Sequence, residues 1–593
     1  MAKEQAKELF PVLEMCPPVR PPDDVPKGEF EIGLACAGAV SAGAYIAGVM
    51  DFLVQALDAW EAAKKDPAFK GKVPDHSVKL TVLTGASAGA INSAIFALLR
   101  HKDFTHFSSD PGEGAGAAKN PLFQSWVNAI DMSRLTGTED LDALGKGQQP
   151  LSLLDSTPLD RIGEQALIDA AALTDKVRDW VADPLRVYLT QTNTRGVPYF
   201  VGFIDGSGSG QGMVQHADQA RFVLFRDKVV PAVDPCGPDD HDHAFPDERA
   251  LAGQPQAADG WRQLPQAALG SSAFPIGLAP RDMTAKPEDY LYRITLPDPN
   301  QPGPDQPQRY VAVQPEGEDW PQDGSLTTPR PYLGMDGGII DNDPFGLARD
   351  MMAGRYGRNP RDGLAANRSV IMIDPFPERP PPGPTDRNGH GLKFLLGTLV
   401  NVLKLQARFR PEDLILAQQE SVYSRFIIVP KREGATKQQY NLACGLLGGF
   451  GGFLARPLRV HDYLNGRRNC QRFLAKHFTL PRDNPLFDSW RDAAWAGDYD
   501  AGGGELPIIP LLKTGPYAIA EQAAPEWPDQ CVDPDLSTRQ VMDRVEKLVP
   551  AMFNLNWLMR QAVKMVIYPK IRGLVKSAIR TAAKEWGVLN RFS

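Results

Sequence analysis

The stretch LTVLTGASAGAINSAIFALLR, residues 80–100, decides how the chain is interpreted. Its apolar first half stops at Ser87, which is flanked on both sides by glycine and alanine, and a helix-like pattern follows at once. A serine at the apex of a sharp strand-to-helix turn takes a strained backbone conformation, so the residues two positions away must be small. Gly85 and Gly89 satisfy this condition in the pattern G-x-S-x-G. The stretch therefore predicts a nucleophilic serine on a tight turn, with a small residue in a crowded bend as the alternative.

The neighbouring segments show the same order of elements. Residues 30–40, FEIGLACAGAV, are strand-like, and the apolar spacing of 41–65 predicts a helix. A second strand is expected at 76–85 and a second helix at 88–102. Strand, turn and helix twice in succession indicate parallel strands in an α/β layered fold. Further strands are expected at 185–194, 197–205 and 368–376.

Composition places the chain among globular proteins. It has 593 residues and a net charge of −8. Its six cysteines form no CxxC pair and no Cys/His cluster with metal-ligand spacing, so we expect no metal site, no disulfide framework and a reducing compartment. The N-terminus lacks a basic region followed by an apolar one, and no uninterrupted apolar run approaches the roughly 18 residues of a spanning helix. We therefore expect a cytoplasmic protein.

Shifts in composition divide the chain into parts. Two stretches dense in Pro, Asp and Gly, near 230–263 and 297–331, cannot supply a core and are interpreted as surface insertions. The segment PFPERPPPGPTDRNGHG, 375–391, is the best candidate linker. The expected parts are an N-terminal segment (1–27), a catalytic α/β domain (28–378), a mainly helical extension (379–535) and a basic helical tail (536–593).

A serine nucleophile needs a base to accept its proton. In the chain order of α/β-hydrolase triads the histidine follows late, which leaves His390, His461 and His477 as candidates. His390 lies in the linker and the other two lie in predicted helices, so none occupies a loop after a late strand. A carboxylate is the other solution. Asp336 precedes two glycines in YLGMDGGIIDNDPFGLARD, 332–350, although Asp-Gly-Gly is also a common surface turn.

Four segments, in this order, resemble the patatin-like phospholipase family, whose catalytic domain is related to that of the cytosolic phospholipases of the A type. ACAGAVSAGAYIAGVMDFL (35–53) resembles the glycine-rich oxyanion loop with its helix, and GASAGA (85–90) matches the nucleophile motif. ALGSSAFPIGLAP (268–280) resembles the family's small-residue block, and DGGIIDNDP (336–344) its Asp-Gly-Gly motif. The resemblance covers about residues 28–378 and implies a three-layer α/β/α sandwich with a mainly parallel sheet, followed here by a mainly helical C-terminal extension.

Carried over residue by residue, the resemblance implies that Ser87 is the nucleophile and Asp336 its general base in a Ser–Asp dyad. The backbone N–H groups of Gly38, Ala39 and Ala88 would form the oxyanion hole. The family needs no histidine, metal or cofactor, which agrees with the poor placement of the histidines. The motif glycines are Gly85, Gly89, Gly337 and Gly338.

The chain departs from the family's pattern in the oxyanion loop. The family has Gly-Gly-Gly-x-Arg/Lys-Gly, whereas this chain has GAVSAG at 38–43. Ala42 stands at the basic position, so a possible phosphate contact is missing, and this bears on phospholipid preference more than on hydrolysis. Alanine and valine keep the backbone donors, but a residue other than glycine adopts positive φ only at an energetic cost.

Two C-terminal segments carry most of the remaining signal. Residues 444–478, rich in small residues and then in Arg, are interpreted as a helical scaffold that packs on the core and roofs the site. Arg456, Arg459 and His461 within it are expected to be solvated rather than functional. Residues 551–593 hold eight Lys or Arg and one acid, a charge of +7, with an apolar helix face. Such a helix lies on an anionic membrane surface or docks on the acidic body of the same protein.

These patterns together predict a lipid acyl hydrolase of the phospholipase or lysophospholipase type, with no nucleic-acid partner. Ser87 would attack the acyl carbonyl to form an acyl-enzyme, which water then hydrolyses. Three alternatives stay open: a Ser–His–Asp triad esterase or peptidase, a lipid-binding or scaffold protein that keeps the fold, and an acyltransferase that uses the same acyl-enzyme. The sequence leaves open the oligomeric state, the lipid head group and the cleaved position.

Overall fold

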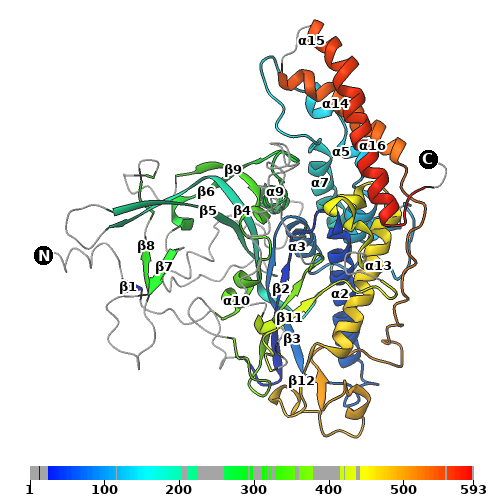
Figure 1. Cartoon of the computed structure of the whole chain (residues 1–593). Helices are drawn as coiled ribbons and strands as arrows, with labels where there is room; N and C mark the ends of the chain where they lie inside the picture. The colour runs from blue at the N-terminus through cyan, green and yellow to red at the C-terminus, as the bar shows by residue number, and fades with distance from the viewer. Residues whose placement is uncertain are drawn as a thin grey trace, which may run out of the picture.

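The computed structural model describes most of the chain, and Figure 1 shows its arrangement. His390 and most of the residues in the expected insertions and the expected linker lie outside the described residues. The structure describes residues 12–13, 25–114, 116–202, 210–224, 226, 259–290, 294–297, 310–313, 315–317, 320–321, 328–353, 359–377, 415–417, 419, 421–435, 441–553 and 557–590.

An eight-stranded sheet forms the centre of the fold, in the order β11-β10-β2-β3-β4-β9-β6, with β5 paired to β4. The run from β11 to β4 is parallel. Parallel neighbours need a crossover connection, and helices provide it after β2 and after β3. The expected mainly parallel sheet is therefore confirmed. Its parallel strands are β11 (Arg425–Ile428), β10 (Arg368–Ile373), β2 (Glu29–Cys36), β3 (Ser77–Gly85) and β4 (Val181–Gly202).

The other three strands of the sheet are antiparallel, and the sequence analysis did not predict them. β5 (Gly210–Leu224) forms a long hairpin with β4. β9 (Arg330–Asp336) pairs with β4, and β6 (Arg281–Ala285) pairs with β9. In Figure 1 these strands extend away from the helical side of the molecule. The antiparallel strand β9 matters for the site, because it ends at Asp336.

The strand β4 runs through the position where a turn was expected. The ranges 185–194 and 197–205 were predicted as two strands, but one continuous strand includes the first and most of the second. The pairing of β4 with β5 shifts register between Thr192 and Val197, and Gly196 within this bulge has φ +71°. A bulge inserts extra residues without ending the strand, so Gly196 marks an irregularity within β4 and not the end of a strand.

Helices cover both faces of the sheet, which confirms the three-layer α/β/α fold. The larger core joins the sheet to α2 (Gly43–Lys65), α3 (Ala88–Leu99), α9 (Asp259–Ser271) and α13 (Arg456–Lys476). The opposite core joins it to α10 (Phe345–Ala353). Side chains alternate between the two faces along a strand, so β2 contributes to both cores.

The helices α2 and α13 lie side by side at backbone contact (Figure 1). A Cβ added to Gly48 of α2 would lie 1.9 Å from the carbonyl oxygen of Tyr463. A Cβ added to Gly466 of α13 would lie 2.2 Å from the carbonyl oxygen of Tyr45. Glycine at both positions is what permits this approach. The expected scaffold role of residues 444–478 is confirmed, because α13 belongs to the same core as the sheet.

The expectation of solvated charge on α13 is wrong for two of its residues. Arg459 and His461 are each 2% exposed. The Arg459 guanidinium donates to the carbonyl of Val127 at 3.0 Å, and His461 Nδ1 contacts Asp462 Oδ1 at 2.7 Å. Arg456 is half-buried and forms an ion pair. The charges are buried because the fold supplies a partner for each of them.

The basic tail folds back on the protein for part of its length. α16 (Tyr568–Glu585) packs against α14 (Pro534–Phe553), and Lys576 forms an ion pair with Asp535 at 2.6 Å. Ile579 of α16 is buried. Docking on the same protein, one of the two alternatives, is therefore confirmed for α16, while the other end of the tail exposes apolar side chains.

One described helical stretch, residues 40–65, is long and apolar enough to cross a bilayer, but 89% of its apolar window is buried within the protein. It has the character of a core helix. The remaining strands and helices are β1 (Val12–Leu13), β7 (Ile294–Pro297), β8 (Tyr310–Val313), β12 (Thr479–Pro481), β13 (Glu505–Pro507), α4 (Pro121–Phe123), α5 (Met132–Leu135), α6 (Glu139–Asp142), α7 (Thr157–Ala172) and α15 (Trp557–Ala562).

Candidate active site

The turn between β3 and α3 has the strained geometry that the sequence predicted. Ser87 has φ 50° and ψ −122°, and it is partly exposed at the apex. A Cβ on Gly85 would lie 2.6 Å from the carbonyl oxygen of Gly89. A Cβ on Gly89 would lie 2.1 Å from the carbonyl oxygen of Cys36. Both glycines of the motif are therefore required by close backbone approach, which is the steric reason given for the pattern.

The end of α9 holds the turn from the other side. The N–H of Ser87 donates to Ser271 Oγ at 3.0 Å, and Ser272 Oγ donates to the carbonyl of Ser87 at 2.9 Å. Both hydroxyls belong to the small-residue segment 268–280. The roles of these two serines were not predicted from the sequence. They fix the backbone of Ser87 on both sides of its Cα.

The loop after β2 faces Ser87 directly. A Cβ on Gly38 would lie 3.3 Å from Ser87 Cβ and 2.2 Å from Asn342 Oδ1. The N–H of Gly38 donates to the carbonyl of Asn342 at 3.0 Å, so this N–H is already bonded. This bond holds the loop, and the role of the Gly38 N–H as an oxyanion donor stays a prediction. Ala39 follows it in the same pocket wall.

Val40 adopts the backbone conformation for which glycine is suited. Its φ is 47°, at the position where the family's pattern has its third glycine. A β-branched residue in this region is an outlier that costs roughly 1–3 kcal/mol and persists only where the surroundings impose it. The next residue supplies that constraint, because Ser41 Oγ donates to the carbonyl of Gly449 and accepts from the N–H of Gly452 at 3.0 Å.

Asp336 lies at the end of β9 and begins a short 3-10 turn. Its Oδ1 accepts the N–H of Gly338 at 2.8 Å, and the residue is 5% exposed. A Cβ on Gly337 would lie 2.2 Å from Thr190 Oγ1, so the first glycine of Asp-Gly-Gly is required by contact with β4. The carbonyl of Asp336 also accepts from Thr192 Oγ1 at 2.8 Å. These bonds fix the Asp336 side chain at the edge of the sheet where the parallel strands end.

One pocket brings these segments together. It encloses about 580 Å³ of empty space, its open side included. Ser87 and Asp336 both line it, and no histidine is among the lining residues that the structure describes. His461 is buried in α13, His477 ends that helix, and His390 lies outside the described residues. The pocket is lined by Gly38, Ala39, Val40, Ser87, Phe274, Pro275, Asp336, Gly338, Ile339 and Asn342.

Asn342 is the site residue that sequence reasoning missed. It is 5% exposed, and its side chain lies between the two glycine-containing loops. Its Oδ1 would lie 2.2 Å from a Cβ on Gly38 and 2.6 Å from a Cβ on Gly338. The amide group donates to Asp343 Oδ1 at 3.2 Å. The signal was present in the segment DGGIIDNDP, where the Asn follows the aspartate motif closely.

The nucleophile available in the pocket is the Ser87 hydroxyl and not a cysteine thiol. Burial raises the pKa of the nearby Cys36 thiol to about 12, so this cysteine stays protonated and does not compete with Ser87 as a nucleophile. Cys36 ends β2, where its carbonyl accepts the N–H of Ala86 at 3.1 Å. Within the described ranges, no three His, Cys, Asp or Glu side chains gather into a set that could hold a metal ion.

Comparison with known proteins identifies the family to which the chain belongs. The family model described as patatin-like phospholipase matches residues 34–349, a span that includes the turn at Ser87 and the Asp-Gly-Gly turn. The chain belongs to the patatin-like phospholipase family, and its fold is the patatin fold. Proteins of this family are ester hydrolases that act on lipid substrates.

The chain also has a relative that matches most of its length. It is 35% identical over 532 residues to a protein of Sinorhizobium fredii (strain NBRC 101917 / NGR234) that is named "Uncharacterized protein y4iI". The matched region covers 85% of this chain and 73% of that protein. The similarity therefore extends beyond the residues that the family model matches and into the C-terminal third.

Proposed function

We propose that the protein is a lipid acyl hydrolase in which Ser87 is the nucleophile and Asp336 the general base. The observation that carries the proposal is their meeting in one pocket, with the strained turn of Ser87 opposite the loop 38–40. Each residue is held by backbone contacts that tolerate only glycine at the neighbouring positions. This arrangement favours a carboxylate base over the triad alternative, because neither His461 nor His477 is among the described residues that line the pocket.

In the proposed mechanism, Ser87 Oγ attacks the acyl carbonyl while its proton passes to the Asp336 carboxylate. The resulting tetrahedral intermediate collapses, the ester C–O bond breaks, and the leaving alcohol takes the proton from Asp336. Water then attacks the acyl-enzyme while Asp336 accepts a proton from it. The bond between the acyl carbon and Ser87 Oγ breaks, Oγ takes the proton back from Asp336, and the fatty acid leaves. The Gly338 N–H bonded to Asp336 Oδ1 orients the carboxylate for both steps.

The negative oxygen of the intermediate needs preorganised donors. We propose the N–H groups of Ala88 and Ala39. Ala88 is the first residue of α3, where backbone N–H groups have no partner in the helix and the helix dipole favours negative charge. Gly38 contributes by its lack of a side chain, which leaves the space in front of Ser87 open.

A fluorophosphonate probe tests the proposal, because it labels activated serines. We expect labelling of the wild type at Ser87, loss of labelling in Ser87→Ala and a strong decrease in Asp336→Asn. Ser133→Ala, which removes an exposed hydroxyl that does not line the pocket, is the matched control and should label fully. Labelling that persists in Asp336→Asn but disappears in His461→Ala or His477→Ala would replace the dyad with a triad.

One observation favours a second candidate, a lipid-binding protein that has lost catalysis. Val40 occupies a glycine conformation beside the nucleophile and narrows the pocket that it lines. A folded wild type that does not label, together with a Val40→Gly variant that does, would support this candidate. Transfer of the acyl group of an ester substrate to an added alcohol rather than to water would identify an acyltransferase.

We further propose that the tip formed by α14, α15 and the π-helical segment 563–567 before α16 binds anionic membranes. Its apolar side chains are exposed where a folded protein normally buries them, and Arg560, Lys564 and Lys570 lie among them. Cations at an anionic lipid surface contribute about 1 kcal/mol each. The exposed apolar residues are Met552, Phe553, Met559, Met565, Val566 and Ile567.

The base of this tip adjoins the rim of the pocket. Arg544 of α14 donates to the carbonyl of Leu153, and the N–H of Leu153 donates to the carbonyl of Ile276 at 2.7 Å. Ile276 is 66% exposed and follows Pro275, which lines the pocket. Apolar groups on the rim and on the tip together favour a substrate that is presented at a lipid surface.

Vesicle co-sedimentation tests the membrane proposal. Replacing Met565 and Val566 by Asp should abolish binding to vesicles of phosphatidylcholine with phosphatidylserine. Leu364→Asp, at an exposed leucine in another part of the fold, is the control and should bind as the wild type does. Equal binding of all three proteins, or binding that is insensitive to the phosphatidylserine content, would refute the proposal.

A further inference from the structure

A second cavity lies beside the catalytic pocket, between the helices α3, α7 and α9 and the π-helical turn at 124–128. It encloses about 520 Å³ of empty space, its open side included, and we call it the α3 cavity. Among the described lining residues, Ser125 contributes the one side-chain hydroxyl and Trp126 the one side-chain N–H. The lining residues are Ile91, Ala94, Ile95, Leu98, Ser125, Trp126, Ile130, Leu159, Ile162, Gly163, Ala166, Pro265, Ala268 and Leu269.

The lining is suited to an apolar ligand. A cavity between core helices is normally filled by side chains, because empty space forfeits dispersion contacts. Apolar cavities without polar partners do not hold ordered water but do take up apolar molecules. The indole N–H of Trp126 is buried without a hydrogen-bond partner, so the described lining offers little to hold water there. The α3 cavity therefore favours a hydrocarbon occupant.

The helix α3 connects this cavity with the nucleophile. Ile91 lies one helical turn beyond Ser87, and Leu98 lies about 16 Å from Ser87 along the helix axis at 1.5 Å per residue. On the opposite wall, Leu269 precedes by two residues the Ser271 that bonds the N–H of Ser87. One side of the cavity thus begins where the reacting carbonyl would be held.

The space between the pocket and the cavity is apolar as well. Leu159, Ile162 and Leu269 line the cavity and belong to the same hydrophobic cluster as Val40. Val40 in turn lines the catalytic pocket. Val40 is therefore shared by the lining of the pocket and by the apolar cluster that reaches the cavity.

We propose that the α3 cavity binds the acyl chain of the ester that Ser87 attacks, and that its length sets the chain-length preference. This inference rests on the proposed function, because it places the acyl carbonyl at Ser87. Each methylene buried in an apolar site contributes about 0.8 kcal/mol, or about fourfold in affinity. Affinity for fatty acids should rise with chain length until the cavity is filled and then stay level.

Gly163 of α7 offers a way to shorten the cavity. It is half-buried, and an added Cβ would lie 3.3 Å from Pro265 Cβ and 3.7 Å from Leu269 Cδ1, so α7 and α9 are in close contact at this point of the cavity wall. The rest of a leucine side chain here finds room only in the adjoining cavity, where it takes space from the acyl chain. Glu164→Leu places the same side chain on the exposed face of the same helix and is the matched control.

The test measures binding rather than turnover. In a Ser87→Ala background, saturated fatty acids from octanoate to hexadecanoate are titrated while tryptophan fluorescence is recorded. We expect Gly163→Leu to shorten the longest chain whose affinity still rises with length. Beyond that length, the affinity should be lower than without this substitution by about fifteenfold for each two methylenes excluded. Glu164→Leu should leave the length profile unchanged, and Trp126→Phe should remove most of the fluorescence change.

The same length profile in Gly163→Leu and Glu164→Leu would overturn the proposal, as would a fluorescence response that Trp126→Phe leaves intact. The Trp126→Phe measurement does not depend on the folding of the Gly163 variant. Because the Ser87→Ala background has no nucleophile, chain binding is independent of catalysis. Length-selective binding without probe labelling of the wild type would refute the hydrolase while supporting the acyl site.

Discussion

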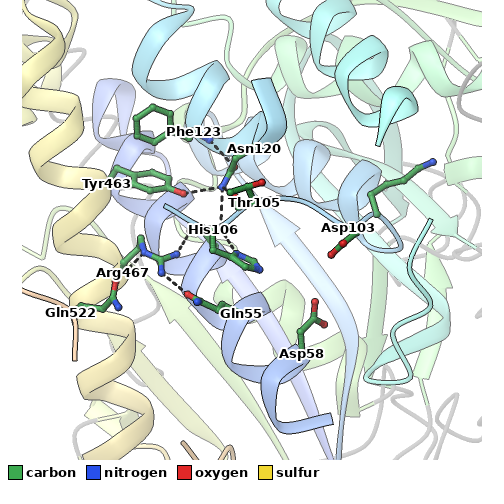
Figure 2. Close-up of polar contacts among 12 residues, drawn as sticks. Gln55, Asp58, Asp103, Thr105, His106, Asn120, Phe123, Tyr463, Arg467 and Gln522 are labelled. Carbon is green, nitrogen blue, oxygen red and sulfur yellow. Dashed lines mark hydrogen bonds and ion pairs between the residues drawn. The ribbon is translucent and has the colours of Figure 1, made fainter. Parts of the chain in front are cut away.

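Replacing Arg467 by methionine tests whether a buried ion pair fixes α13 to α2. The side chains of Asp51 on α2 and Arg467 on α13 are 0% and 1% exposed, and their charged groups are in contact. Asp51 also contacts His106 Nδ1 at 2.7 Å and accepts from Asn120 Nδ2 at 3.1 Å. Figure 2 shows Arg467, His106 and Asn120 converging on this position. Burial alone would raise the pKa of Asp51, but Arg467 and His106 outweigh burial and hold it below its usual range.

The expected effect is large. Removing one partner of a buried ion pair leaves an uncompensated charge and costs about 3–5 kcal/mol. Arg467 also bonds Gln55 on α2 and Gln522 at 3.2 Å, and these contacts are lost with the guanidinium. Methionine keeps an unbranched chain of similar reach, so a cavity adds little. A loss of this size is a substantial share of the 5–15 kcal/mol that stabilises typical folded proteins.

Urea unfolding followed by circular dichroism measures the change as a shift of the midpoint at constant slope. Lys65→Met removes an exposed ion pair, with Asp179 at 2.7 Å, and should change stability by less than about 1 kcal/mol. The double variant Asp51→Asn with Arg467→Met should recover part of the loss. The reasoning is refuted if Arg467→Met behaves like Lys65→Met, or if the double variant is no more stable than Arg467→Met.

Three further changes test the site and the core. Gly89→Ala should abolish probe labelling and lower the free energy of unfolding by about 1–3 kcal/mol, because its Cβ would lie 2.1 Å from the Cys36 carbonyl oxygen; Gly573→Ala, whose Cβ meets nothing within 4 Å, is the control for both readouts. Val40→Gly should raise the labelling rate, since glycine adopts a φ of 47° without strain; an unchanged rate in a folded variant contradicts this. Asp51→Asn should make stability less sensitive to acid. The folded pKa of Asp51 lies below 3.8, so its stabilisation is complete above that value and is lost as the pH falls through the lower folded pKa; parallel acid-unfolding curves for the two proteins would show the reasoning to be wrong.

The tight turn at Ser87 and the strand–helix units around it could be predicted because their determinants are local. The strand expected at 76–85 is β3, and the helix expected at 88–102 begins at Ala88 as α3 does. A short apolar run, a glycine pattern and a helical period lie within one continuous stretch. Gly85 is required by a contact within this stretch, with Gly89, whereas Gly89 is required by a contact with Cys36 at the end of β2.

The antiparallel strands β5, β6 and β9 could not be predicted in the same way. β9 and β6 pair with strands that lie far away in the chain, as β9 does with β4. β5 carries many polar and exposed residues, so neither its hydrophobicity nor its alternation marks it as a strand. The contacts of Ser271 and Asn342 with the catalytic loops depend on the same long-range arrangement.

The helix α13 shows where a rule based on composition fails. Fourteen of its residues are buried, although the segment RPLRVHDYLNGRRNCQRFLAK is dominated by polar and charged residues. Charged side chains usually indicate a solvated face, and that expectation was wrong for Arg459 and His461. Such a helix can be buried where its polar groups find partners, as Arg459 does at the Val127 carbonyl. That partner is invisible in the helix sequence, whereas the partner of His461 is the next residue, Asp462.

The buried charges of α13 also reach the catalytic pocket. The Asp462 carboxylate accepts the N–H groups of Ala443 and Cys444 at 2.8 Å each and so holds the start of the 3-10 turn 443–449. That turn ends at Gly449, whose carbonyl accepts from Ser41 Oγ next to the strained Val40. The loop opposite Ser87 is thus held in its unfavourable conformation by a helix more than 400 residues away in sequence. This explains why the C-terminal third cannot be a passive appendage: the strain at Val40 needs a rigid support, and α13 provides it.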